Sequence, residues 1–131
     1  MADTGREKPK KSKREKQVDT ILKLLGDPVL FHDQHDTPYI RLEQSNAKIT
    51  IPVKSRRFKT WLANLFYTKT DNVPNSDTIR DVIRVLRGKA LFEGQEYTLY
   101  NRVAPADHGF WIDMCDDKWR AIRVTRDGWK I

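Results

Sequence analysis

The sequence predicts an α+β domain in which two short antiparallel β-meanders flank a central pair of helices. Apolar and polar residues alternate in the first and last thirds of the chain, as in half-buried strands. In the middle third, apolar residues recur every three or four positions, as on a helix that buries one face. The strands are grouped and do not alternate with helices, which argues against a doubly wound parallel sheet. The 131 residues suffice for one hydrophobic core.

The N-terminal segment is strongly basic. Residues 1–16 contain seven Lys or Arg against three acidic residues, and no large apolar residue follows Met1. Such a segment cannot bury enough apolar surface to order itself. We therefore expect a disordered basic arm over residues 1–16 and a single α+β domain over residues 17–131.

A short amphipathic helix follows the arm and ends at residues 26–28, where Gly, Asp and Pro stop it. Three strand-like runs come next, over Val29–His32, Tyr39–Leu42 and Ala47–Val53. Turn-forming residues separate them. We expect these runs to form the first antiparallel meander.

The middle of the chain predicts two consecutive helices. The first begins at Ser55, a good N-cap residue, and ends near Asp71. The second begins around Ser76 and continues to Gly88, or as far as Gly94. Apolar residues lie at helical spacing in both, so each helix is expected to bury one face.

The last third predicts a second antiparallel meander, rich in aromatic and β-branched residues. Its strand-like runs are Glu96–Val103, Gly109–Cys115, Trp119–Val124 and Trp129–Ile131. The first turn is expected at 104–107. Because the two central helices need a sheet to cover, we expect the aromatic residues here to lie mainly in the core. The alternative is an exposed face on which Trp and Arg side chains stack unpaired bases.

Composition limits the classes of protein that fit. The formal charge of +7 favours a polyanion or an anionic surface as partner. The single cysteine, Cys115, excludes an intrachain disulfide. No apolar run approaches the ~20 residues that a membrane span needs. We expect a soluble, cytoplasmic protein with no membrane partner.

The motifs of the common enzyme classes do not occur. The chain has no GxxxxGKS or GxxxxGKT phosphate loop, no GxGxxG, no HExxH and no GxSxG. We therefore expect a non-enzymatic protein with no catalytic residue and no cofactor.

Two groups of side chains have metal-ligating chemistry. They are His32, Asp33, His35 and Asp36, and Asp107, Asp113, Asp116 and Asp117. A strand would send His32 and His35 to opposite faces, and no spacing brings the second group together. We expect no metal site in either group. The first group is expected to be hydrogen-bonding turn residues, and in the second Asp116 and Asp117 are expected in a hairpin turn and Asp107 in a loop. Cys115 near His108 does not define a thiol nucleophile, and a buried structural cysteine is expected.

Basic residues carry the main functional prediction. Those expected to contact nucleic acid are Lys54, Arg56, Arg57 and Lys59 around the start of the first central helix, Arg80, Arg84 and Arg87 on the second, and Lys10, Lys11, Lys13 and Arg14 in the arm. Free N–H groups and the helix dipole at a helix start also favour a phosphate. The alternative is an ordinary solvated face, in which Asp77 and Asp81 neutralise the arginines three residues later.

Four segments together resemble a known region. They are LFHDQHDTPYIRL at 30–42, SRRFKTWLANLFY at 55–67, LRGKALFEG at 86–94 and WIDMCDDKWRAIRVTRDGW at 111–129. In order and spacing they resemble the small region that precedes the P-loop ATPase core in primase-helicase or replication ATPase proteins of phages and integrated mobile elements. The resemblance implies a role at DNA during replication, next to a motor ATPase. It implies no ATP hydrolysis by this chain, because the ATP-binding motif of those proteins lies outside the matched stretch.

Three functional hypotheses follow from the sequence. The first is a non-enzymatic DNA-binding accessory domain of a primase-helicase system. The second is a docking or oligomerisation module for a replicative ATPase. The third is a small metal-dependent nuclease or primase that uses Asp33, Asp36, Asp113 and Asp116.

Overall fold

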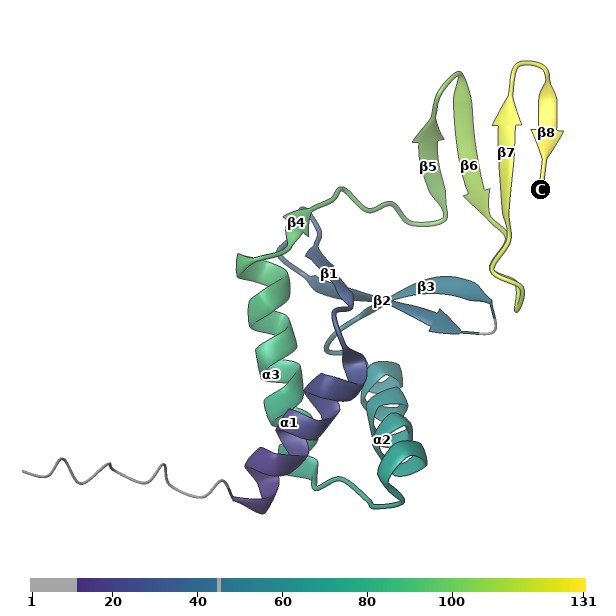
Figure 1. The fold of residues 1–131 in the computed structure, drawn as a ribbon. Coiled ribbons are helices and arrows are strands. Elements are labelled where there is room, and N and C mark those ends of the chain that lie inside the picture. The colour runs from purple at the N-terminus through teal and green to yellow at the C-terminus, as the bar shows by residue number, and fades with distance from the viewer. Residues whose placement is uncertain (1–11, 45) are drawn as a thin grey trace, which may run out of the picture.

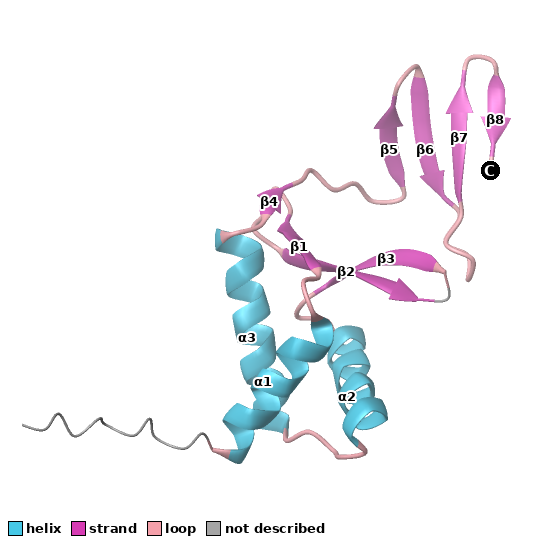
Figure 2. Ribbon diagram, in the orientation of Figure 1, coloured by secondary structure: helices cyan, strands magenta, loops and turns pink. Residues whose placement is uncertain are grey.

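The computed structural model describes residues 12–44 and 46–131 and has the α+β class expected from the sequence (Figure 2). Its helices are α1 Lys13–Leu25, α2 Arg56–Thr70 and α3 Ser76–Phe92. Its strands are β1 Val29–His32, β2 Pro38–Gln44, β3 Ala47–Pro52, β4 Gln95–Glu96, β5 Val103–Ala106, β6 Gly109–Asp113, β7 Ala121–Thr125 and β8 Gly128–Lys130. None of α1–α3, the helices of the described residues, is long and apolar enough to cross a membrane.

Helix α1 begins inside the segment that was expected to be a disordered arm. The Ser12 hydroxyl accepts a hydrogen bond from the Glu15 N–H at 3.2 Å, and the Ser12 N–H donates to the Glu15 carboxylate at 3.0 Å. This capping box satisfies N–H groups at the helix start without any apolar contact. The prediction of disorder is therefore wrong for residues 13–16. Residues 1–11, with Lys10 and Lys11, lie outside the described residues.

The core lies between the three helices and the first sheet. Helix α3 packs on β1 and β2, α2 packs on β3, and α1 packs against both α2 and α3 (Figure 1). The buried side chains of this core are Ile21, Ile40, Leu42, Ile49, Ile51, Val53, Phe58, Leu62, Phe66, Val82, Ile83 and Leu86. They come from the apolar positions that the periodicity of the sequence indicates.

The first sheet has the strand order β3-β2-β1-β4. Strands β1–β3 form the expected antiparallel meander, and β4 adds a short parallel edge beside β1. Gly94 permits this arrangement, because a Cβ there would lie 2.5 Å from the Ala90 carbonyl oxygen and 2.7 Å from that of Leu30. The end of α3 can therefore approach β1 closely enough for the chain to enter the sheet.

The second sheet, β5-β6-β7-β8, is the expected antiparallel meander with different strand bounds. Residues 97–102 are not a strand, and β5 occupies the predicted turn at 104–106. Pro105 fits there because β5 is an edge strand that pairs only with β6. Trp119 lies in the loop before β7 and not on a strand.

The second sheet stands away from the helices (Figure 1), and its aromatic residues do not form a core. Phe110 is 40% exposed, Trp111 42% and Trp129 68%. The expectation that they pack in the core is wrong, because the helices cover β1–β3 and leave both faces of β5–β8 open. Cys115 is exposed as well, against the expectation of a buried thiol. Among the described residues, none after Ala90 is fully buried.

Candidate nucleic-acid interface

A groove of about 740 Å³ lies between α2 and α3. Five cationic side chains line it, Lys54, Lys59, Arg80, Arg84 and Arg87. Its other lining residues are Ala63, Ile79 and Ile83, which are apolar, and Thr60 and Ser76, which carry hydroxyls. No acidic residue of the described chain is among them. The groove therefore joins concentrated positive charge to an apolar floor.

The helical spacing of the sequence places these cations outward. Leu62 and Phe66 of α2, and Val82 and Leu86 of α3, are buried against the core. On α3, Arg80, Arg84 and Arg87 lie on the face turned away from these buried residues. On α2, Lys59 lies beside the buried row of the helix, and Lys54 precedes the helix. The first turn of α2 has no acidic residue, so the positive end of its helix dipole adds to the charge.

A polar contact from α1 fixes the start of α3. The Gln17 side-chain oxygen accepts hydrogen bonds from the Thr78 hydroxyl at 2.9 Å and from the Asn75 N–H at 3.3 Å. Thr78 is fully buried. This contact holds the first turn of α3, from which Ser76 and Arg80 reach the groove.

Two acidic residues on α3 pair with arginines that line the groove. Arg80 lies 3.5 Å from Asp77, and Arg84 lies 3.9 Å from Asp81, and these arginine side chains are 68% and 74% exposed. Exposed ion pairs of this kind are worth about 0–1 kcal/mol. In the described part of the chain, Arg87 has no ion pair or hydrogen bond. The pairs that the solvated-face alternative expects are therefore present for Arg80 and Arg84, whereas Arg87 is left without one among the described residues.

Two of the cations expected in the arm are ordered on α1, outside the groove. The Arg14 Nε lies 3.1 Å from the Asp81 carboxylate, closer than Arg84 does. Arg14 therefore competes with Arg84 for Asp81. Lys13 is exposed in the first turn of α1 and does not line the groove.

The cations at the start of α2 are divided between two surfaces. Lys54 and Lys59 line the groove, whereas Arg56 and Arg57 do not. The Arg57 guanidinium lies 5.2 Å from the centre of the Trp119 ring, in the loop between β6 and β7. This cation–π contact links α2 to the second sheet.

The carboxylates of the nuclease hypothesis are not gathered into one site. Asp113 accepts a hydrogen bond from the Cys115 N–H at 2.8 Å, within its own turn. Hydrogen bonds from the backbone and guanidinium of Arg120 lower the pKa of Asp116. Asp33 accepts from two N–H groups of its own turn. Asp33 and Asp116 have the hydrogen-bonding turn role that the sequence predicts, and Asp113 ends β6.

The first candidate metal group is only partly brought together. His32 and Asp36 meet Glu96 of β4, and the ligand atoms of the three side chains lie within 4.8 Å of one another. Asp33 and His35 are not part of this group. Glu96 was not among the residues predicted from the sequence, because only the parallel pairing of β4 with β1 places it beside His32.

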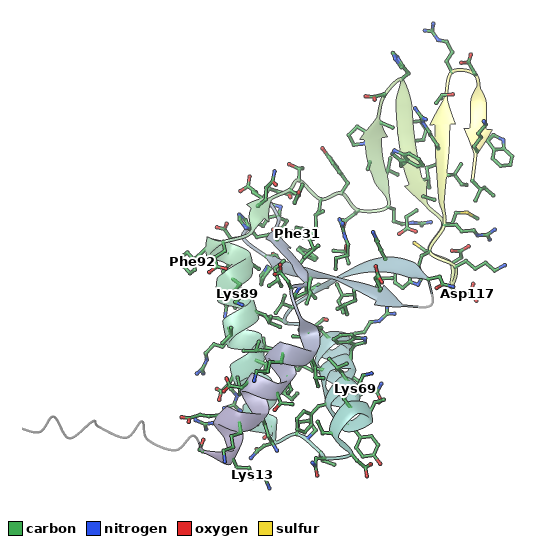
Figure 3. The ribbon with its side chains drawn as sticks, viewed as in Figure 1. Lys13, Phe31, Lys69, Lys89, Phe92 and Asp117 are labelled. Carbon is green, nitrogen blue, oxygen red and sulfur yellow. The ribbon has the colours of Figure 1, made fainter. Side chains whose placement is uncertain are left out.

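The second sheet has two faces of different chemistry. Register places seven apolar residues on one face, namely Val103, Pro105, Phe110, Ile112, Ile122, Val124 and Trp129. The other face carries Trp111, with the Arg123 guanidinium 5.8 Å from the ring centre. Side chains project from both faces in Figure 3, and no helix covers them.

Comparison of the chain with protein-family models, with curated proteins and with solved structures finds no match.

Proposed function

We propose that the chain is a non-enzymatic nucleic-acid-binding module whose α2–α3 groove holds the phosphate backbone. The observation that carries the proposal is the lining of the groove by five cations and no acidic residue. Phosphate contacts by Lys and Arg supply most of sequence-independent nucleic-acid affinity. The apolar floor excludes some water from these contacts, which strengthens them.

The spacing of the arginines on α3 suits a repeating anion. With a rise of about 1.5 Å per residue, Arg80, Arg84 and Arg87 extend over roughly 10 Å of the helix. A duplex strand advances about 3.4 Å along its axis for each phosphate. The stripe is therefore long enough to contact more than one phosphate of a strand. DNA at a replication ATPase is the setting we propose, in line with the resemblance of four sequence segments to the region before such motors.

The test compares two double variants that remove equal charge. Arg84→Ala/Arg87→Ala removes two cations from the groove. Lys69→Ala/Lys89→Ala removes two exposed cations from the last turns of α2 and α3, outside the groove (Figure 3). Affinity for a duplex and for a single-stranded oligonucleotide is measured against salt by fluorescence anisotropy. The groove variant should lower the slope of log affinity against log salt by about 0.9 per lost duplex contact.

The control variant should leave the slope close to that of the parent chain. Equal slopes for the two double variants would show that affinity depends on net charge and not on the groove residues. That result would contradict the proposal. The absence of complexes with both oligonucleotides at low salt would also contradict it. The number of contacts follows from dividing each slope by about 0.9 for the duplex and about 0.7 for the single strand, and the larger number identifies the ligand with more phosphate contacts.

A second candidate function is self-association through the apolar face of β5–β8. This face carries no charged residue, so two copies can pack on it without bringing their like charges into contact. A two-fold axis would place the same apolar residues opposite one another. Four strands about 4.8 Å apart and about five residues long cover roughly 300 Å² in plan. Since a stable interface buries about 800 Å² per partner, we expect a weak dimer.

Sedimentation equilibrium over a wide concentration range tests the self-association. The parent chain should pass from monomer to dimer as concentration rises. Trp129→Lys should abolish the dimer, because it places a charge on the apolar face. Thr125→Lys, on the opposite face of the sheet, is the matched control and should still dimerise. A strict monomer at every concentration would contradict this second candidate.

A further inference from the structure

The strongest feature outside the groove is the meeting of three ligand types from three segments. His32 ends β1, Asp36 lies in the turn that follows, and Glu96 lies on β4. Register pairs His32 with Glu96 across the two parallel strands. One imidazole nitrogen and two carboxylate oxygens come within 4.8 Å of one another.

The orientation of the His32 ring is fixed from outside this group. Its Nδ1 lies 2.8 Å from the carbonyl oxygen of Ala90, near the end of α3. That carbonyl lacks its usual helical donor, because the Gly94 N–H donates to Lys89 instead. A carbonyl oxygen only accepts hydrogen bonds, so Nδ1 carries a proton and donates. In the neutral ring, Nε2 then presents its lone pair to the carboxylates.

The gap between His32 and Glu96 suits an ion better than a direct contact. The Nε2 and the Glu96 Oε1 lie 4.0 Å apart. This distance is too long for a hydrogen bond. A zinc ion binds nitrogen at about 2.0–2.1 Å and oxygen at about 2.0–2.2 Å, so it can touch both atoms. Glu96 is 61% exposed at its side chain and can rotate to close the geometry.

We propose that His32, Asp36 and Glu96 form a binding site for a divalent cation, with Zn²⁺ as the expected metal. An imidazole with two carboxylates is a ligand set that zinc accepts, with a fourth position for water. The hydrogen bond from His32 to Ala90 is the kind of support that metal-ligating histidines have. It sets the tautomer that leaves Nε2 free for the metal.

The ion would join the β1–β2 turn to β4. Strand β4 has two residues and pairs only with β1. The chain leaves β4 for residues 97–102 and the second sheet. Metal binding at this point fixes the start of that connection to the body of the fold, so the site is structural in role.

The experiment titrates Zn²⁺ alone into the metal-free full chain by isothermal calorimetry. One equivalent should bind, and Asp36→Asn or Glu96→Gln should each weaken binding by more than about tenfold. Both substitutions keep the size of the side chain. His35→Gln removes a neighbouring imidazole that lies outside the group and should bind zinc like the parent chain.

Side-chain nitrogen spectra of His32 give an independent readout. Zinc should shift the Nε2 resonance strongly and leave Nδ1 protonated. Equal zinc affinity in the parent chain, Asp36→Asn and Glu96→Gln would overturn the proposal, as would a zinc-induced shift at Nδ1 in place of Nε2. Circular dichroism of the metal-free variants shows whether they are folded. No binding by a folded parent chain would also overturn it.

Discussion

At the scale of single residues, Asp33 shows how this fold stabilises a buried carboxylate. Its side chain lies in the β1–β2 turn and is 6% exposed. Burial alone would raise the pKa of this carboxyl group. Hydrogen bonds from the N–H groups of Thr37 and His35, each 2.9 Å long, outweigh burial and lower the pKa. The ionised form therefore holds the turn.

This lowered pKa predicts a loss of stability in acid. A group with a depressed pKa in the folded state stabilises the fold above its unfolded value of about 3.9, and this contribution is lost as pH falls. Asp33→Asn should lower the free energy of unfolding at pH 7 by about 1–2 kcal/mol. It should also reduce the acid-dependent loss. Urea unfolding between neutral and acidic pH measures both effects.

The exposed Asp117 provides the control for this prediction. Asp117→Asn should have the stability of the parent chain at neutral pH and the same response to acid. If Asp33→Asn lost as much stability in acid as the parent chain, the turn hydrogen bonds would not be the cause.

The sequence predicts that residues of the candidate groove lie together only when they belong to the same helix. Arg80, Arg84 and Arg87 lie four and three positions apart, so helical geometry alone places them on one face. Lys54 precedes the α2 cap and Lys59 lies inside the helix. Only the packing of α2 beside α3 brings these two lysines to the arginines. Spacing along the chain does not contain that information.

At the scale of elements, local signals predicted the helices well and one strand badly. The Ser55 hydroxyl oxygen accepts a hydrogen bond from the Phe58 N–H and caps α2, as expected. Asp71 ends the helix, also as expected, with a positive φ of 58°. The composition of 104–106 is typical of a turn, but these residues form a strand. Pro105 is tolerated there because β5 is an edge strand, in which a residue without an N–H donor breaks no ladder between two neighbours. Edge position is a tertiary property.

The start of α1 was also predicted wrongly, because a helix forms where no structure was expected. Hydrophobic content indicated no structure before residue 17, whereas the Ser12–Glu15 capping box begins the helix among charged residues. The ion pair of Arg14 with Asp81 then joins this first turn to α3. A cap motif was present in the sequence, but a criterion based on burial does not detect it.

At the scale of the whole molecule, burial is concentrated in one part of the chain. The fully buried residues of the described chain lie between Ile21 and Ala90. Sheet β5–β8 forms a single layer that the helices do not cover. A sheet gains stability mainly by packing one face. The first sheet has helices on one face, and the second has no such cover.

This contrast predicts unequal local stability. Amide hydrogen exchange at low protein concentration should be slower in β2 and α3 than in β6 and β7, although all four elements are hydrogen bonded. Exchange by local opening depends on the packing lost in that opening. Equal protection of the two sheets in dilute solution would contradict the prediction.

Amide hydrogen exchange at high protein concentration distinguishes the stability of the sheet in a single chain from protection by a second copy packed on it. If the apolar face of β5–β8 packs on itself, protection of β6 and β7 should rise with concentration, while that of β2 and α3 stays constant. Trp129→Lys should remove the rise and leave the dilute exchange rates nearly unchanged, since Trp129 is 68% exposed in the single chain. A rise that persists in this variant would place the contact on another surface.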